Sequence, residues 1–128
     1  MDGIGCIMIA IGIDIQSIDE FAAASSLLET NLCFTEAECT HSERAPSGAI
    51  ASLAGIFAAK EALLKALPNR PLCYWVDIEV TYDRSGRPMF QFYGELARWI
   101  EALRWNVIPT ISHSGNYALA LAVVDHNK

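Results

Sequence analysis

Residues 53–67 read LAGIFAAKEALLKAL, a stretch with very few polar side chains. Its polar side chains are Lys60, Glu61 and Lys65, and all the others are apolar or small. A surface helix carries a broad polar face. We therefore expect a long central helix that is buried nearly all round and has one narrow charged window.

The charged window has a simple interpretation and a sharper one. An α-helix turns about 100° per residue, which puts Lys60 about 100° from Glu61 and Lys65 only about 40° from Glu61, one turn on. The simple interpretation is a surface Glu61–Lys65 pair worth about 0.3–0.5 kcal/mol. The more specific interpretation is a binding site, and it requires a second acidic side chain elsewhere in the chain that lies close to these three residues in the fold.

Asp14 is that second acid, in the apolar run IAIGIDIQSIDE at residues 9–20. An ionised carboxylate in apolar surroundings must shift its pKa, find a cation or bind a metal. Asp14 and Glu61 together offer two carboxylates to a hard cation such as Mg²⁺, which also accepts phosphate oxygens. Lys60 and Lys65 would hold further phosphate charge. The pattern favours a magnesium–diphosphate site.

The remaining segments predict one α+β domain over residues 1–128. A buried strand is expected at 7–15, an acidic helix at 17–32, a capping box at 35–38, and the central helix from its Ser47 cap to 67. Alternation predicts a strand at 75–82 with Asp77 and Glu79 solvated, a hairpin partner at 89–93, a helix at 95–105, and strands at 107–112 and 117–124.

Composition narrows the function classes. The net charge is −6, and all nine lysines and arginines lie from Arg44 onward, which disfavours nucleic-acid binding. The apolar N-terminal run is too short for a membrane span and has no basic start, so we expect neither a signal peptide nor a membrane partner. The four cysteines form no CxxC pair, which is typical of free thiols in a cytoplasmic protein.

The sequence resembles the holo-acyl-carrier-protein synthases of the 4′-phosphopantetheinyl transferase superfamily. GIDI, FAAKEALLKAL, WVDIEVTYDRSGRP and ISHSGNYALALAVV occur in the family's order and spacing. The resemblance implies an antiparallel sheet packed on a long central helix, and a homotrimer whose active sites are shared between subunits. It also implies transfer of 4′-phosphopantetheine from coenzyme A to a serine of an acyl carrier protein, with release of 3′,5′-ADP.

The resemblance also implies residue roles. Asp14 and Glu61 match the family's magnesium ligands, and Lys65 matches a lysine near the transferred phosphate, so these three are the predicted catalytic residues. Lys60 precedes the metal-binding glutamate, as in the family motif, and is predicted to bind substrate with Lys65. The resemblance also matches one histidine and one loop to positions close to coenzyme A, and these residues are predicted to bind substrate too: His113, Gly86, Arg87 and Pro88. The base that accepts the serine proton stays open between Glu61 and a metal-bound water.

Three departures from the family concern the partner protein. The helix after the first strand usually carries a basic residue that docks the acidic carrier, whereas this chain has Asp19 and Glu20. Ile56 replaces an arginine common in GRFAAKEA, and the family's glycine-rich loop after the helix is missing. We expect coenzyme A binding to survive these changes and the carrier to be a dedicated, atypical one.

Two other functions compete with the transferase. A drifted paralogue would bind coenzyme A or cap an oligomer without catalysis, and the departures from the family favour it. A different metal-dependent phosphate enzyme, such as a nucleotide hydrolase, would use the same acids. The intact set of Asp14, Glu61 and Lys65 argues against the first alternative, and the lack of a further acid or nucleophile motif argues against the second.

Overall fold

The computed structural model describes residues 8–25 and 30–126. Its elements, in chain order, are β1 (Met8–Ser17), α1 (Ile18–Ser25), α2 (Thr30–Cys33), α3 (Glu36–Glu43), α4 (Ala49–Ala66), the 3₁₀ turn η1 (Trp75–Asp77), β2 (Ile78–Tyr82), β3 (Pro88–Phe92), α5 (Gly94–Ala102), β4 (Trp105–Ser114) and β5 (Tyr117–His126). No helix among these residues is long and apolar enough to cross a membrane.

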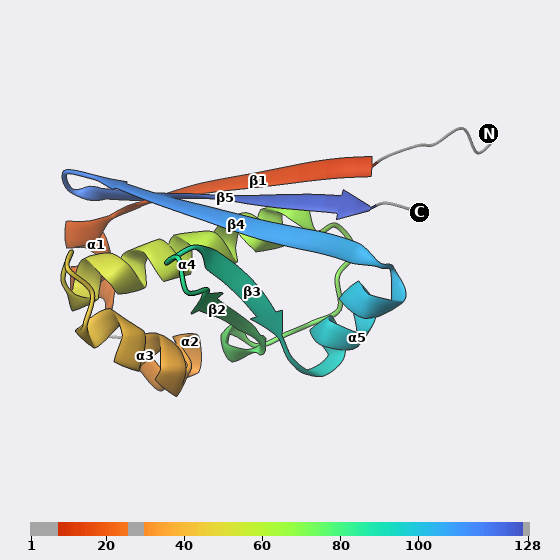
Figure 1. Ribbon diagram of the computed structural model, residues 1–128, viewed down its shortest axis with the longest axis horizontal. Helices are drawn as coiled ribbons and strands as arrows, with labels where there is room; N and C mark the ends of the chain where they lie inside the picture. Colours follow the sequence, from red (N-terminus) through yellow and green to blue (C-terminus); the bar gives the residue numbers. More distant parts are fainter. Residues whose placement is uncertain (1–7, 26–29, 127–128) are drawn as a thin grey trace.

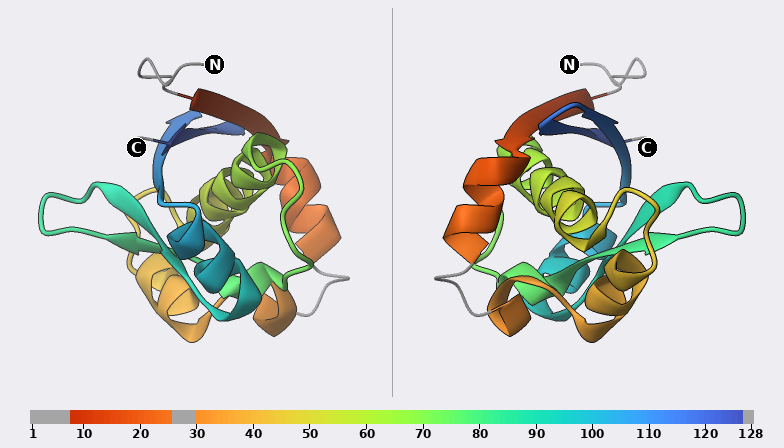
Figure 2. Two further views of the ribbon diagram at one scale, coloured as in Figure 1. Left: turned by 90° about the vertical axis from the view of Figure 1, so that its right-hand side faces the viewer. Right: turned by 90° about the vertical axis from the view of Figure 1, so that its left-hand side faces the viewer.

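The strands form two antiparallel sheets on different sides of α4 (Figure 1). The larger sheet has the order β1-β5-β4, with Asp14 opposite Ala120 and Ala120 opposite Ile111. The smaller is the hairpin β2–β3, whose tip projects from the body of the molecule (Figure 2). Gly86 forms that tip with φ +87°, a conformation that glycine adopts without steric cost.

One face of α4 packs on the inner face of the larger sheet through small residues. Ala118, Ala120 and Ala122 of β5 are fully or almost fully buried against it. Gly12 of β1 lies on the helix backbone, because a Cβ built there would be only 1.8 Å from the carbonyl oxygen of Ala62. Strand and helix thus approach until their main chains touch, and this contact sets their relative position.

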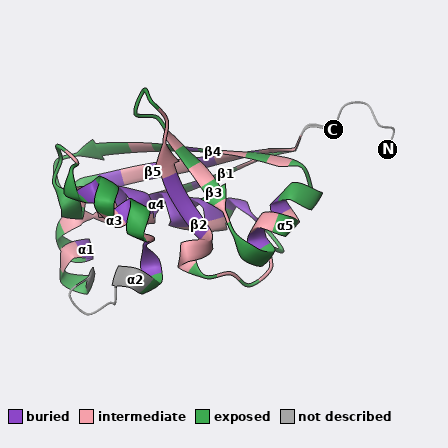
Figure 3. Cartoon of the chain, turned by 60° about the horizontal axis from the view of Figure 1, so that its bottom comes forward, coloured by how far each residue is buried: buried purple, intermediate pink, exposed green. Residues whose placement is uncertain are grey.

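The opposite face of α4 is covered by aromatic rings from α1, the α2–α3 region and η1. The Phe57 ring centroid lies 5.8 Å from that of Phe21, 6.3 Å from that of Phe34 and 5.0 Å from that of Trp75. Buried residues therefore concentrate along α4 and β2 in the middle of the molecule (Figure 3). This confirms the expected central helix, buried nearly all round.

The outer face of the larger sheet is apolar and uncovered. Four isoleucines of β1 point outward, each more than half exposed: Ile9, Ile11, Ile13 and Ile15. Ile108 and Tyr117 of β4 and β5 are also more than half exposed. The prediction of a fully buried first strand is therefore wrong for one of its faces, since α4 covers only the other.

Several predicted boundaries shift for local reasons. The N-cap of α4 is Gly48, with φ +96°, and not Ser47. Residues 75–77 form a 3₁₀ turn, closed where the Tyr74 N–H donates to Asp77 Oδ2 at 2.8 Å, so the strand starts at Ile78. Where one helix was expected at 17–32, the described residues form α1 and α2. Residues 26–29 lie outside the part of the chain that the structure describes. The capping box of α3, between Thr35 and Glu38, is confirmed.

Candidate active site

Asp14 projects from the inner side of β1, toward α4. Side chains alternate along a strand, so Asp14 shares a face with Gly12 and Gln16. Its side chain is 12% exposed. Both carboxylate oxygens have partners, since Oδ2 accepts from Gln16 Nε2 at 2.6 Å and Oδ1 accepts from Lys65 Nζ at 3.0 Å. The period of the strand would have identified Gln16, which the sequence analysis missed.

Glu61 faces the same place from α4, one helical turn before Lys65. Partial burial and the negative charge of Asp14 raise the pKa of Glu61, while the positive charges of Lys65 and Arg70 oppose that rise. The structure therefore brings together the three residues expected to be catalytic, namely Asp14, Glu61 and Lys65. Two carboxylates that repel one another form a place where a cation would relieve the repulsion.

The donor set would supply part of a magnesium coordination shell. The residues that the structure describes contain no group of three or more histidine, cysteine, aspartate or glutamate side chains that could hold a metal. Mg²⁺ is commonly bound by one or two carboxylates, water and phosphate oxygens. Asp14 and Glu61 would supply the carboxylates and water the remaining ligands, and diphosphate oxygens would replace some of the water when a substrate binds.

A cavity of about 230 Å³ lies near the other end of α4 and collects three of the predicted substrate-binding residues: Gly86, Pro88 and His113. The His113 ring is fixed by a hydrogen bond from Nε2 to the carbonyl oxygen of Ala51, at 2.8 Å. Gly86 and Pro88 belong to the β2–β3 hairpin and His113 to β4, so two segments separated in the sequence meet at this cavity, which we call the His113 cavity.

Two further residues of this cavity were not predicted. The ring of His41, on α3, stacks on that of Tyr82, on β2, with centroids 3.7 Å apart and planes within 8°. Burial and the negative charge of Glu38 raise the pKa of Tyr82 to about 12, so its hydroxyl stays neutral at physiological pH. Nothing in the sequence places α3 beside β2, and the pair could not have been found from spacing alone.

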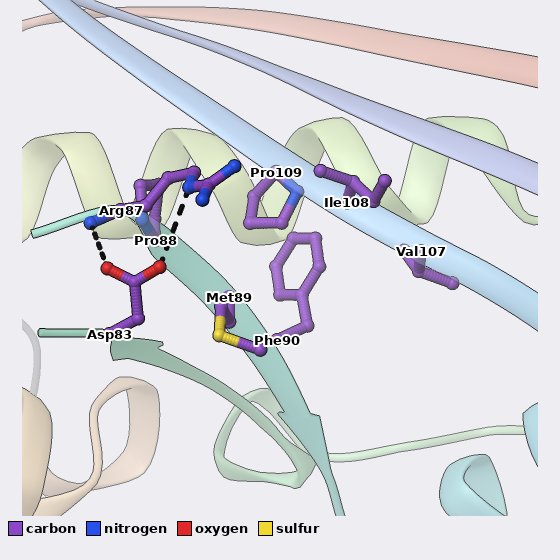
Figure 4. Close-up of a pocket in the computed structure, with 8 residues that line it drawn as sticks. All are labelled: Asp83, Arg87, Pro88, Met89, Phe90, Val107, Ile108 and Pro109. Carbon is purple, nitrogen blue, oxygen red and sulfur yellow. Dashed lines mark hydrogen bonds and ion pairs between the residues drawn. The ribbon is translucent and has the colours of Figure 1, made fainter. Parts of the chain in front are cut away.

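Arg87 does not line the His113 cavity and contacts Asp83 instead. Its backbone N–H donates to Asp83 Oδ1 at 2.9 Å, and its Nε lies 3.5 Å from Asp83 Oδ2. Together with Pro88, it lines a second cavity of about 290 Å³ between β3 and β4, whose apolar wall includes Phe90 and Pro109 (Figure 4). The Arg87 side chain is 77% exposed.

The two groups of predicted residues meet α4 at different positions. The His113 ring lies against Ala51 and Gly55, whereas Asp14 pairs with Lys65. Glu61 comes six residues after Gly55, which is about 9 Å along the helix axis. Neither Asp14 nor Glu61 is among the described residues that line the His113 cavity.

The family follows from a match over most of the chain. The family model of the 4′-phosphopantetheinyl transferase superfamily matches residues 10–122. The chain belongs to this superfamily. It is 38% identical over 125 residues to the holo-[acyl-carrier-protein] synthase of Streptomyces avermitilis, covering 92% of this chain and 98% of that protein. It is 34% identical over 121 residues to that of Borrelia hermsii, covering 91% and 97%.

Solved structures of transferases agree with the fold. The apo ACPS structure of Chronobacterium ammoniagenes matches with a TM-score of 0.83 and 30% identity, over 96% of this chain and all 100% of that one. The complex of the same organism's ACPS with CoA matches with a TM-score of 0.81 and 30% identity, over 94% and 99%. The predicted family, α+β fold and enzyme class are confirmed.

Lys60 of this transferase is part of the core and not of a substrate site. The side chain is 0% exposed. Its ammonium donates to Glu38 Oε1 at 2.7 Å, to the Cys33 carbonyl at 2.8 Å and to the Trp75 carbonyl at 3.2 Å. An ammonium has three donors, and all three are used, so the prediction that Lys60 binds substrate is contradicted. The 100° step from Glu61 directs it to the far side of α4.

Glu38 joins three elements of the transferase around Lys60. It is 0% exposed, and Oε1 also accepts from the backbone N–H of Thr35 at 2.9 Å while Oε2 accepts from that of Val80 at 2.7 Å. Glu79, predicted to be solvated, is 9% exposed and accepts from the hydroxyls of Thr35 and Tyr93. This buried network holds α3 and β2 against α4 and so shapes the wall of the His113 cavity.

Proposed function

We propose that the chain, as a single phosphopantetheinyl transferase domain, moves the 4′-phosphopantetheine arm from coenzyme A to a serine of an acyl carrier protein, with Mg²⁺. The convergence of Asp14, Glu61 and Lys65 carries this proposal. It is supported by the similarity to holo-[acyl-carrier-protein] synthases and to a structure of ACPS with CoA.

The site residues suit a diphosphate transfer. The serine hydroxyl attacks the β-phosphorus of coenzyme A and gives its proton to Glu61 or to water, a new P–O bond forms, and the bond to the bridging oxygen breaks to release 3′,5′-ADP. When bound, Mg²⁺ would neutralise negative charge on the diphosphate as its bridging bond breaks. Asp14 and Glu61 hold the ion, and the Lys65 ammonium stabilises negative charge on the transferred phosphoryl oxygens.

The His113 cavity suits the nucleotide end of coenzyme A. Gly86 and Pro88 present the hairpin loop to it, and the stacked His41 and Tyr82 rings give it an aromatic wall. Arg87, which lies beside Pro88 in an exposed position, is placed to meet a phosphate if it leaves Asp83.

We propose further that each active site forms between two copies of the chain in a homotrimer. Two features support this: the acid pair does not line the His113 cavity within the described part of one chain, and the larger sheet has an uncovered isoleucine face. Exposed apolar patches of this kind commonly mark protein interfaces. A neighbouring copy would bring its His113 cavity to the Asp14 end of the first.

The experiment that tests the transfer is a mass measurement on carrier proteins. The protein is incubated with coenzyme A, Mg²⁺ and a panel of apo carriers, and we expect one carrier to gain a phosphopantetheine group. Asp14→Ala should abolish the gain, while Glu101→Ala, an exposed acid on α5, should not change it. Binding of coenzyme A without any adduct would instead indicate the drifted paralogue, and nucleotide cleavage without a carrier would indicate a hydrolase.

A further inference from the structure

The ammonium of Lys65 binds one of the two acids directly. Its Nζ lies 3.0 Å from Asp14 Oδ1 and 3.0 Å from the carbonyl oxygen of Ile13. Its charge also opposes the rise in the pKa of Glu61, so it acts on both carboxylates. The Lys65 side chain is 54% exposed, compared with 12% for Asp14.

The two oxygens of Asp14 are not equivalent. Oδ2 accepts a hydrogen bond of 2.6 Å from Gln16, the next residue along the same strand face. Oδ1 faces Lys65, which holds it at 3.0 Å. An ammonium and a divalent cation repel one another, so a metal ion that binds Oδ1 competes with the Lys65 contact.

We propose that Lys65 is a placeholder for the divalent cation: it holds the acid pair while no metal is present and is displaced when the metal binds. This inference rests on the proposed function. The long, exposed side chain can rotate out without disturbing the core. Once displaced, the Lys65 ammonium can bind the diphosphate oxygens. Metal binding would therefore place two positive charges, the metal ion and Lys65, near the substrate.

The test is metal binding in the absence of coenzyme A. Mn²⁺, which takes the same oxygen ligands as Mg²⁺, is titrated against the full chain and free ion is followed by electron paramagnetic resonance. Lys65→Met should bind Mn²⁺ at least about threefold more tightly than the wild type, because no ion pair has to be broken. Lys65→Gln should behave like Lys65→Met, and Lys65→Arg should restore the wild-type affinity.

A matched control separates displacement from a general loss of positive charge. Arg70 also opposes the rise in the pKa of Glu61, but its guanidinium donates to the carbonyl oxygens of Leu64 and Leu67. Arg70→Gln should therefore tighten Mn²⁺ binding less than Lys65→Met does. Equal tightening in both variants, or no tightening in Lys65→Met, overturns the proposal.

The outcomes also separate this inference from the proposed function. If the wild type modifies a carrier with Mg²⁺ but Lys65→Met binds Mn²⁺ no more tightly, the placeholder role fails and the transferase stands. If Asp14→Asn leaves Mn²⁺ binding unchanged, or no form of the protein binds Mn²⁺, the acid pair is not the metal site and both proposals fail. Circular dichroism verifies that each variant is folded.

Discussion

Among single residues, Glu61 lies in an environment that suits metal binding but destabilises the folded protein. Its carboxylate is partly buried and faces Asp14, and both effects raise its pKa. A group whose pKa is higher in the folded state loses stabilising free energy as the pH rises through that value. At neutral pH and without metal, the ionised acid pair therefore opposes folding.

Glu61→Gln should remove this repulsion. We expect the metal-free variant to melt a few degrees above the wild type at pH 7, since charge interactions at partly exposed sites are worth roughly 0.2–1 kcal/mol. The difference should shrink toward pH 4, where the wild-type carboxyl is protonated. Thermal unfolding followed by circular dichroism measures both.

Added Mg²⁺ should reverse the order of the two melting temperatures, because only the wild type keeps both carboxylate ligands. A lower melting temperature for Glu61→Gln at pH 7 would show that Lys65 and Arg70 outweigh the repulsion, and that Glu61 is stabilising even without metal.

Single residues also show where sequence reasoning succeeded and where it stopped. Asp14, Glu61 and Lys65 could be grouped because strand alternation, the helical repeat and the family motif agree. Lys60 was misassigned because its partner, Glu38, lies on a different helix, and no local pattern reveals which acid reaches a buried lysine. Glu38 itself was recognised only for its capping role.

Among the elements, α1 carries the charge that most concerns the partner protein. The start of α1 is held by the side chain of Asn116, in the β4–β5 turn. Its Oδ1 accepts from the Asp19 backbone N–H at 3.0 Å, and its Nδ2 donates to the Ser17 hydroxyl at 3.1 Å. The side chains of Asp19 and Glu20 are exposed. An acidic carrier helix would be repelled by them, which supports the proposal of an atypical carrier.

Asp19→Arg should therefore improve the use of an ordinary acidic carrier protein. We expect kcat/KM for that carrier to rise severalfold at low ionic strength and the gain to fade in salt, since the effect acts on encounter. Glu101→Arg makes the same charge change on α5 and serves as the control. Equal kinetics for the wild type and Asp19→Arg at low salt would show that α1 does not meet the carrier.

The elements themselves were predictable to different degrees. The central helix, the hairpin and the two C-terminal strands were correctly placed because their patterns are long and their turns contain glycine. The start of β2 was not, because alternation at 75–77 does not distinguish a strand from the 3₁₀ turn that Asp77 closes. Ile56, which stands where the resemblance implies an arginine, is fully buried, so the Ile56 side chain packs in the core.

At the scale of the whole molecule, the separation of the two predicted residue groups leads to a test of the shared site. Asp14→Ala and His113→Ala should each be inactive alone. Mixed subunits should regain activity, because some interfaces then combine an intact acid pair with an intact cavity. Random one-to-one trimers should reach about a quarter of wild-type activity.

Subunits are exchanged by co-expression, and the trimer is verified by light scattering. A mixture that stays inactive would place both lesions in one site within a single chain. The sequence could not provide this separation, because it depends on where along α4 each remote segment docks.

The main-chain contact of Gly12 with Ala62 has one more consequence. Gly12 is two residues from Asp14, and Ala62 is next to Glu61. The spacing between the acids is therefore set mainly by contact between the two main chains and much less by side-chain packing in the core. Core residues elsewhere can be substituted during evolution without changing that spacing. A single added methyl group, as in Gly12→Ala, would force the strand and the helix apart and so increase the distance between the two carboxylates.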